Sequence, residues 1–381
     1  MHRNPFSDRE LDHRLVSVRT AIAESGLDAA ILSSPENIFY LTGLDHWGYF
    51  APHMLIVPLQ GRPLLLTREM ERVTIEKMVR VADFQGHSDA ESVADGAASA
   101  LRDRSLTGRR IGLEFWSAGL SHGLACALRA KAFADWTDIS GLVDTVRQVM
   151  SAEEQALIRR AAAVTNSATA GAVAAIRDGA DERAVAAECL AAMTRAGGEP
   201  PGFGPFIRPG SRLGEEHTTW GQGTYCTGET VFLEIAGCVG RYNAPNGRLV
   251  HVGPVPDRNQ DAASIAEAAF EAVLQALRPG AIARDVYAAW QNIVDDAGLS
   301  HYRRHHCGYV VGIAFPPSWA GGNTVTGLRH DSDLMIREGM GFHIMSWLMG
   351  CGLGDFFLSN CVLLTDEGPE VLTTTPHLNS V

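Results

Sequence analysis

The sequence predicts a two-domain α/β protein in which a smaller N-terminal domain precedes a larger C-terminal domain. The chain has 381 residues, which is long for a single hydrophobic core. Short apolar runs alternate with helical patterns up to about Val146, as in an α/β domain. The sequence Ser151-Ala-Glu-Glu154 then has the form of a capping box and begins a long Ala-rich helix. We place the domain boundary just before this helix, which gives domains 1–147 and 148–381.

The N-terminal domain begins with a predicted helix over residues 10–25, because apolar residues recur there at helical spacing and Gly26 is a natural stop. Residues 28–32 form an apolar run that predicts a strand. The segment 33–37 contains Ser, Pro and Asn, which are typical of a turn. Further strands are predicted over residues 54–57, 63–67 and 110–113.

The C-terminal domain begins with the capping-box helix, which is predicted to continue to Ile176. Asp181 has the position and chemistry of an N-cap for a second helix, which ends near Ala196. The segment 197–214 is rich in Gly and Pro and predicts a shaped loop over a site. Further helices are predicted over residues 262–277 and 283–297, with strands between the helical segments.

Composition and charge exclude several classes of protein. The chain is 46% hydrophobic with a formal net charge of -12, which is ordinary for a water-soluble protein and makes nucleic acid an unfavourable partner. No uncharged apolar run reaches the length needed to span a membrane, and the first ten residues have no apolar signal-peptide core. The cysteines are scattered, without a C-x-x-C pair, so we expect free thiols and a cytoplasmic location. The seven cysteines are Cys126, Cys189, Cys226, Cys238, Cys307, Cys351 and Cys361.

Several motifs of the C-terminal half resemble those of the pita-bread superfamily, which includes creatinase, aminopeptidase P, prolidase and methionine aminopeptidase. The resemblance implies an α+β pita-bread catalytic domain behind a smaller α/β domain of the creatinase type. It further implies a homodimer in which the N-terminal domain of one subunit covers the site of the other. The motifs are Ser151-Ala-Glu-Glu-Gln-Ala-Leu-Ile-Arg-Arg-Ala161, Arg278-Pro-Gly280, Arg337-Glu-Gly-Met340 and Thr365-Asp-Glu-Gly368.

Other segments resemble the metal-independent branch of this superfamily, represented by creatinase and, more closely, by ectoine hydrolase. One of them lies in the N-terminal domain, where Tyr40-Leu-Thr-Gly43 is followed by Trp47 and Phe50. The remaining segments are His217-Thr-Thr-Trp220, Leu233-Glu-Ile-Ala-Gly-Cys238 with Arg241, Tyr242 and Arg248, and Gly308-Tyr309 with Phe315-Pro-Pro-Ser-Trp319.

The resemblance also locates a metal site that this sequence has lost. Peptidases of the superfamily hold two divalent metals with two Asp, one His and two Glu. Pro and Met offer no hard oxygen ligand, and a neutral Tyr or Ser hydroxyl is a poor one. We therefore predict no metal and no cofactor, and we treat His305 and His306 as structural, since neighbours on a strand face opposite sides. The five ligand positions are occupied by Glu234, Pro245, Tyr309, Met345 and Ser359.

Glu234 and His217 are the candidate catalytic residues. From the pattern alone, Glu234 would face solvent from a half-buried strand, as charged residues usually do. The resemblance instead directs it into the site, where burial would raise its pKa and suit it to acid–base work. His217 alone would be a solvated loop residue, but the resemblance makes it the counterpart of the catalytic His of creatinase. Metal-free hydrolysis of a C–N bond needs such a proton shuttle.

The resemblance places further side chains around a small-molecule substrate. Tyr309 either donates a hydrogen bond to the substrate or fills the space left by the metals. Arg248 is expected to bind a substrate carboxylate in a bidentate manner, with an ion pair as the alternative. The remaining candidates are the aromatic residues Trp220, Trp319, Trp347, Trp47 and Phe50, together with His343 and Asp355 beside the lost ligand positions.

These features predict a metal-independent hydrolase that acts on a C–N bond of a small amidine, guanidino or cyclic amide compound, with ectoine as the leading example. The first alternative is a Xaa-Pro dipeptidase-type metallopeptidase with ligands drawn from Glu215, His217, Asp355 and His343. A second is a non-catalytic pita-bread binding module, against which the retained His217 and Glu234 argue. A lyase acting on a small zwitterion is a third. Metal content would separate the hydrolase from the metallopeptidase.

Overall fold

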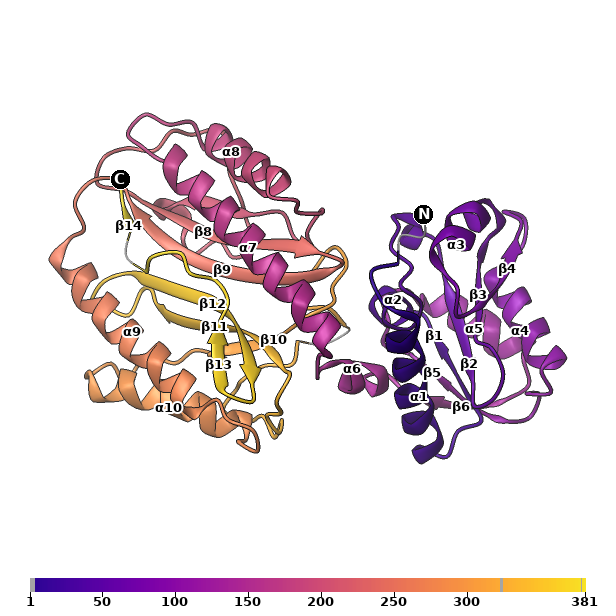
Figure 1. The fold of residues 1–381 in the computed structure, drawn as a ribbon. Helices are drawn as coiled ribbons and strands as arrows, with labels where there is room; N and C mark the ends of the chain where they lie inside the picture. Colours follow the sequence, from indigo (N-terminus) through magenta and orange to yellow (C-terminus); the bar gives the residue numbers. More distant parts are fainter. Residues whose placement is uncertain (1–3, 323–324, 378) are drawn as a thin grey trace. The chain divides into compact units, whose positions relative to one another are not determined.

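The computed structural model describes residues 4–322, 325–377 and 379–381, and it divides into two compact units (Figure 1). The first unit runs to Arg147 and includes a short segment that begins at Gly321. The second unit comprises Gln148–Ala320 and the chain from Val325 onward. Figure 1 shows the first unit in indigo and purple, and most of the second in magenta to yellow. In the described part of the chain, no helix is both long and apolar enough to cross a membrane.

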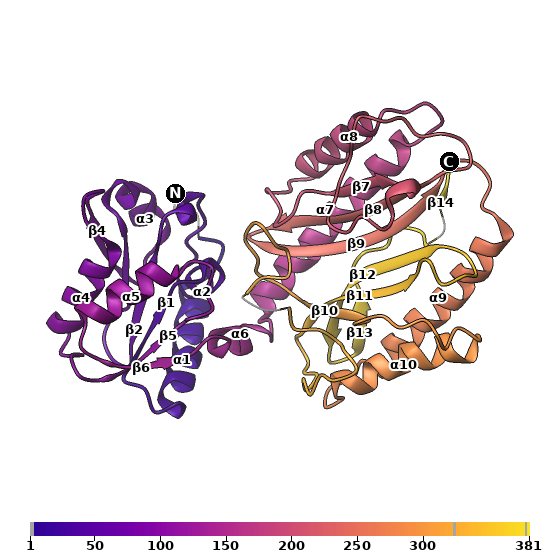
Figure 2. The same ribbon diagram turned by 180° about the vertical axis from the view of Figure 1, so that it is seen from behind.

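The first unit is built on a mixed six-stranded sheet with the order β4-β3-β2-β1-β5-β6. Strand β1 pairs antiparallel with β2 and parallel with β5. Figures 1 and 2 show α4 and α5 on one face of this sheet and α1 and α2 on the other, so the sheet is covered on both sides. The elements are α1 Asp8–Glu24, β1 Ala29–Leu32, α2 Pro35–Thr42, β2 Met54–Pro58, β3 Leu64–Arg68, α3 Arg72–Met78, β4 Asp83–His87, α4 Val93–Asp103, β5 Arg110–Leu113, α5 His122–Lys131, β6 Asp135–Asp138 and α6 Leu142–Arg147.

The predicted turn at residues 33–37 is wrong, because a helix, α2, begins there. Pro35 occupies its first turn, where the missing N–H is not needed, and Gly43 ends it in the left-handed conformation with φ of 70°. Just before the helix, the Glu114 carboxylate accepts hydrogen bonds from the backbone N–H groups of Ser33 and Ser34 at 2.6 and 2.9 Å. A long-range carboxylate thus satisfies donors that a local turn would otherwise satisfy.

The second unit is built on an eight-stranded sheet whose main path has the order β10-β11-β12-β9-β8-β7. Helix α7 packs on β8 and β9, and α9 packs on β11 and β12. Figure 2 shows this sheet from behind, with α7 on its far side. The elements are α7 Ala152–Ala175, α8 Glu182–Arg195, β7 Phe206–Pro209, β8 Thr230–Val239, β9 Tyr242–His251, α9 Asp257–Ala276, α10 Ala283–Asp296, β10 Gly308–Val311, β11 Gly341–Leu348, β12 Phe356–Thr365, β13 Gly368–Val371 and β14 Asn379–Ser380.

Alternation along these strands separates a helix-covered face from an open face. On β8, Gly237 meets the backbone of α7, so odd-numbered residues face the helices and Glu234 faces the other way. On β11 and β12 the residues at even positions, such as Phe342 and Leu358, pack in the core with α9 and α10. The residues at odd positions, such as His343, therefore lie on the same open face as Glu234.

Two segments of the second unit differ from the sequence prediction. The Gly/Pro-rich segment 197–214 contains a strand, β7, which pairs antiparallel with β8, and a short 3-10 helix at Gly210–Arg212. This segment forms a strand because it pairs with β8, and the composition of the segment alone does not indicate that pairing. Helix α9 begins at Asp257, five residues before the predicted start, with Pro256 as its N-cap residue and no side-chain capping hydrogen bond.

Candidate active site

Glu234 lies halfway along β8, on the open face of the second sheet and one strand in from the edge strand β7. Its register partners across the sheet are Phe206 on β7 and Gly247 on β9, and Gly247 in turn pairs with Ser359 on β12. Ser359 pairs with Met345 on β11. All five positions expected from the resemblance to metal-binding relatives therefore lie on consecutive strands, with Pro245 on β9 and Tyr309 on β10. The row of register partners has Glu234 at one end and Met345 at the other.

The Glu234 side chain is a nearly buried carboxylate without a hydrogen-bond partner among the described residues. The residue is 9% exposed. Burial raises its pKa from 4.5 to about 8, with the Glu216 charge in the same direction and the Arg208 and Arg304 charges opposing it. A carboxyl group with such a pKa can both accept and return a proton near neutral pH.

Three aromatic side chains, Phe232, Trp347 and Phe357, form a cluster beside Glu234 on the open face. Phe232 and Phe357 are stacked with ring centroids 5.0 Å apart, and Trp347 lies 4.6 Å from Phe357. The Phe357 ring lies over Gly247, where an added Cβ would come within 2.1 Å of it. Only glycine at 247 leaves room for this ring.

A chain of buried hydrogen bonds crosses the open face beyond this cluster. The Trp319 indole N–H donates to the Tyr309 hydroxyl at 2.7 Å, the Tyr309 oxygen lies 2.8 Å from His343 Nδ1, and His343 Nε2 lies 2.7 Å from Ser359 Oγ. Burial lowers the pKa of His343 to about 3, so its imidazole is neutral. A neutral imidazole donates at one nitrogen and accepts at the other, so Tyr309 and Ser359 have opposite hydrogen-bonding roles toward His343.

Tyr309 stays protonated in this chain. Burial raises its pKa well above the ordinary value, and the nearby charge of Glu234 adds to that effect. A neutral phenol held on the open face within electrostatic range of Glu234 is suited to hydrogen bonding with a bound substrate. The structure thus brings Tyr309, Trp319 and His343 together in one chain of hydrogen bonds.

His217 is exposed on the loop after β7, with its backbone in the left-handed region at φ of 56°. Its ring lies against Phe206, the register partner of Glu234, at a centroid distance of 5.8 Å. The position of this loop is set by Arg208, whose guanidinium donates to the carbonyls of Arg212, Leu213 and Thr218 at 3.1, 3.3 and 3.2 Å. Sequence reasoning missed Arg208, although a lone Arg between apolar residues and before a Gly-rich loop is a usable signal.

The expected metal ligands do not form a metal site in this chain. Pro245 and Met345 supply no hard donor, and both nitrogens of His343 are engaged by Tyr309 and Ser359. Within residues 4–322, 325–377 and 379–381, no group of three or more His, Cys, Asp or Glu side chains has a metal-binding arrangement. A dinuclear metal centre of the family type therefore does not fit the residues present.

Arg248 does not lie on the open face, so its predicted role as a substrate clamp is wrong. It is fully buried on the helix-covered side of β9, one residue away from Gly247. Every nitrogen of its guanidinium donates to the protein: Nη1 to the carbonyls of Gly247 and Ser359, both at 2.6 Å, and Nη2 to Asn360 Oδ1 at 2.8 Å. Nε donates to the Pro376 carbonyl at 2.9 Å. Arg248 joins β9, β12 and the C-terminal segment.

The remaining candidates lie outside the hydrogen-bonded chain. Asp355 is in the turn between β11 and β12, where its carboxylate accepts a hydrogen bond from the Gly350 N–H at 2.8 Å. Trp220 is half-buried and makes no ring contact with the site aromatics in the described part of the chain. Trp47 and Phe50 belong to the first unit and are 64% and 80% exposed.

His305 and His306 lie in the loop before β10 rather than on a strand, so the argument from strand alternation does not apply to them. Their rings touch edge to face at 4.1 Å. Burial lowers the pKa of His306 to about 3, so its imidazole is neutral near neutral pH. Neither imidazole belongs to a metal-binding group of the described residues.

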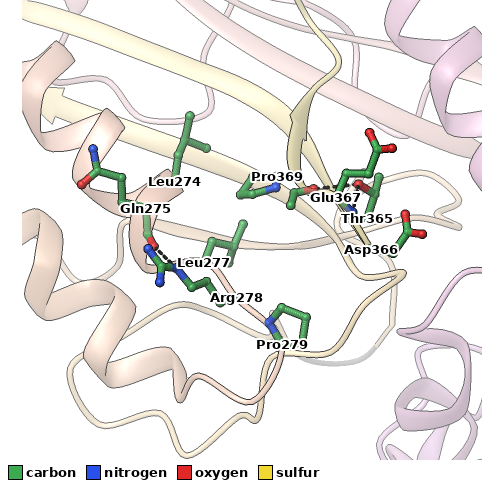
Figure 3. Close-up of a pocket in the computed structure, with 10 residues that line it drawn as sticks. Leu274, Gln275, Leu277, Arg278, Pro279, Thr365, Asp366, Glu367 and Pro369 are labelled. Carbon is green, nitrogen blue, oxygen red and sulfur yellow. Dashed lines mark hydrogen bonds between the residues drawn. The ribbon is translucent and has the colours of Figure 1, made fainter.

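A separate surface pocket lies between the end of α9 and the turn that joins β12 to β13 (Figure 3). Its polar groups are occupied locally: Arg278 Nε donates to the Gln275 carbonyl at 2.7 Å, and the Thr365 hydroxyl donates to the Gly368 carbonyl at 2.9 Å. None of its lining residues belongs to the row or to the chain of hydrogen bonds described above. We assign it no catalytic role.

The eight-stranded sheet with four helices, preceded by a smaller α/β unit, places this chain in the pita-bread class of proteins. The solved Xaa-Pro dipeptidase from Bacillus anthracis has the same fold, with a TM-score of 0.85 and 20% identity over 97% of this chain and 100% of that chain. The family model for metallopeptidase family M24 matches residues 156–366, and the creatinase/prolidase N-terminal domain model matches residues 14–149. The chain belongs to metallopeptidase family M24.

Several relatives match along nearly the whole chain. Ectoine hydrolase of Halomonas elongata is 27% identical over 394 aligned positions, covering 98% of this chain and 97% of the relative. An uncharacterized hydrolase/peptidase of Sinorhizobium fredii is 28% identical over 391 positions, with coverage of 98% and 97%. The likeness therefore extends through both units.

Proposed function

We propose that this protein hydrolyses a C–N bond of a small amidine, guanidino or cyclic amide compound without a catalytic metal, in the manner of ectoine hydrolase. The observation that carries the proposal is the nearly buried Glu234 carboxyl group, which has a pKa of about 8 and no hydrogen-bond partner among the described residues. Its surroundings are aromatic rings and a phenol instead of metal ligands. The full-length likeness to ectoine hydrolase supports the same reaction class.

In the proposed reaction, Glu234 takes a proton from a water molecule as the water oxygen bonds to the electrophilic carbon. The resulting tetrahedral intermediate collapses when its C–N bond breaks. His217, or the proton now held by Glu234, protonates the leaving nitrogen, so the net change is addition of one water across the C–N bond. A cationic amidinium bound beside Glu234 favours its ionised form and so prepares it to act as a base.

The test is product formation from a defined panel. The purified full chain is incubated with ectoine, hydroxyectoine, creatine and a Xaa-Pro dipeptide, each with and without added Mn²⁺, and products are quantified by mass spectrometry. We expect turnover of a cyclic amidine or guanidino compound that is independent of added metal. Metal-dependent cleavage of the dipeptide alone would favour the metallopeptidase alternative. Binding without turnover of any compound would favour a non-catalytic module, and elimination without water uptake would favour a lyase.

The donor set predicts a low metal content. We expect protein purified without chelators to contain Mn, Fe, Co and Zn in amounts far below one ion per chain, because Pro245 and Met345 stand at ligand positions. Elemental analysis by mass spectrometry measures this directly. Two ions per chain whose removal by a chelator abolishes turnover would contradict the proposed mechanism.

Replacing His217 is expected to slow turnover by about 100- to 10,000-fold, the usual contribution of a positioned acid or base. We choose His217→Asn, because Asn adopts the left-handed backbone found at this position and so preserves the loop. His13→Ala, at an exposed position of α1, is the control and should leave the rate unchanged. A His217→Asn enzyme with a near-normal rate would show that His217 does not shuttle the proton.

We further propose a homodimer in which Trp47 of one subunit covers the substrate of the other. Trp47 is 64% exposed, so Trp47→Ala should change the free energy of unfolding by no more than about 0.5 kcal/mol while raising the dissociation constant for substrate. Trp116→Ala, also in the first unit and 74% exposed, is the matched control. Light scattering reports the oligomeric state. An unchanged dissociation constant in Trp47→Ala, or a monomer with full activity, would contradict this arrangement.

A further inference from the structure

A second arginine, Arg304, lies over a different ring of the aromatic cluster from Arg208. The Cζ atom of Arg208 is 4.0 Å from the centroid of Phe232, and the Cζ atom of Arg304 is 4.6 Å from that of Trp347. Because the rings of the cluster are on the open face with Glu234, both guanidinium groups lie over that face. Both charges also act on the Glu234 carboxyl group, opposing the larger effect of burial on its pKa.

The two arginines differ in what they bind. Arg208 uses three nitrogens to hold backbone carbonyls of the His217 loop. Apart from the Trp347 ring, the side-chain partner of Arg304 among the described residues is the Tyr302 hydroxyl, and no carboxylate of the described chain lies within ion-pair distance of it. Arg304 is half-buried, and its Cζ atom lies over the Trp347 ring. A guanidinium that stacks by its face keeps the N–H groups of its edge available for a planar acceptor such as a carboxylate.

We propose that Arg304 binds a carboxylate of the substrate, the role that the sequence assigned to Arg248. The proposal rests on the function proposed above and narrows its substrate class to small C–N compounds that carry an anionic group, such as cyclic amidine carboxylates and guanidino acids. The substrate would place its anionic end at Arg304 over Trp347 and its amidine or amide group toward Glu234. An electrically neutral analogue would lose the first of these contacts and keep the second.

The test compares acid and amide forms of the same probes. Ectoine and creatine, and the carboxamide derivative of each, are titrated into the full-length protein by isothermal calorimetry. The variants are Arg304→Gln, Arg304→Lys and the control Arg303→Gln, which removes a neighbouring charge paired with Asp295 at 2.6 Å. We expect wild type and Arg303→Gln to bind at least one acid about tenfold or more tightly than its amide, since a charge-assisted hydrogen bond contributes that much.

In Arg304→Gln we expect the acid to bind as weakly as the amide, while Arg304→Lys recovers part of the preference because it keeps the charge but not the planar fork. Equal affinity for acid and amide in wild type, or an equal loss in Arg303→Gln, would overturn the assignment. Arg304-dependent binding without turnover would support it and contradict the proposed hydrolysis. Failure of every probe to bind wild type would overturn both, and urea unfolding midpoints would confirm that each variant is folded.

Discussion

Glu234→Gln is expected to reduce turnover by about 100- to 10,000-fold while leaving the fold intact. Gln has nearly the same shape as Glu but cannot accept the proton of the attacking water. The carboxylate has no hydrogen-bond partner among the described residues, so the substitution leaves no broken contact behind. Steady-state rates on the substrate found in the panel measure the effect. Glu216→Gln, an exposed neighbour whose charge also acts on Glu234, is the control and should retain most activity.

Glu234→Gln should also change how the free energy of unfolding depends on pH. In the folded protein Glu234 keeps its proton up to about pH 8, whereas in the unfolded chain it releases it near the ordinary value of 4.5. The unfolded state therefore binds fewer protons across this window, and the wild type loses stability there by up to about 1.4 kcal/mol per pH unit. Glu234→Gln lacks this loss, so its stability advantage should grow from about pH 4.5 to pH 8 and then level off. A constant difference in urea midpoint across this range would show that Glu234 is solvated.

Arg248→Met should instead lower the free energy of unfolding by on the order of 3 kcal/mol or more. The substitution removes the Arg248 donors to the carbonyls of Gly247, Ser359 and Thr375, and each buried group left unsatisfied costs about 1–3 kcal/mol. The unfolding midpoint in urea, at constant m-value, measures the loss.

Arg195→Met, at a side chain 76% exposed, is the control for the arginine substitution itself and should be near neutral. Affinity for a carboxylate probe should follow the fraction of Arg248→Met that is folded. If Arg248→Met were as stable as wild type and had lost only substrate affinity, Arg248 would bind the substrate carboxylate after all. That result would contradict the hydrogen-bond geometry described above.

Much of the fold follows from local sequence signals, whereas the direction of a side chain depends on strand register. The capping box at Ser151 and the N-cap at Asp181 form as expected, because each depends on residues within one turn of helix. Arg248 was misplaced because its face is set by the hairpin between β8 and β9. Gly240 and Arg241 both have positive φ there, and this two-residue turn pairs Glu234 with Gly247. Position 248 then faces away from the site.

The register of β8 and β9 could have been predicted from the sequence, since a two-residue turn between two apolar runs fixes every pair along both strands. The contacts of Arg304 and Phe357 could not have been predicted from the sequence in the same way. Arg304 lies in an irregular loop before β10, and its contact with Trp347 joins segments that are far apart in the chain. The burial of Glu234 could likewise be predicted only from the family resemblance, because isolated charged residues in strands usually face solvent.

The ring of Phe357 over Gly247 also obstructs a metal centre of the kind expected in metal-binding relatives. Restoring acidic and imidazole side chains at positions 245, 309, 345 and 359 would supply ligands, yet the ring would still occupy the space between Glu234 and Ser359. An engineered return to a dinuclear peptidase would also need a small residue at 357, and removing that ring would withdraw its contacts from Phe232 and Trp347. A dinuclear metal centre is thus obstructed by volume as well as by ligand identity, and variants that change the ligands alone should gain no metallopeptidase activity.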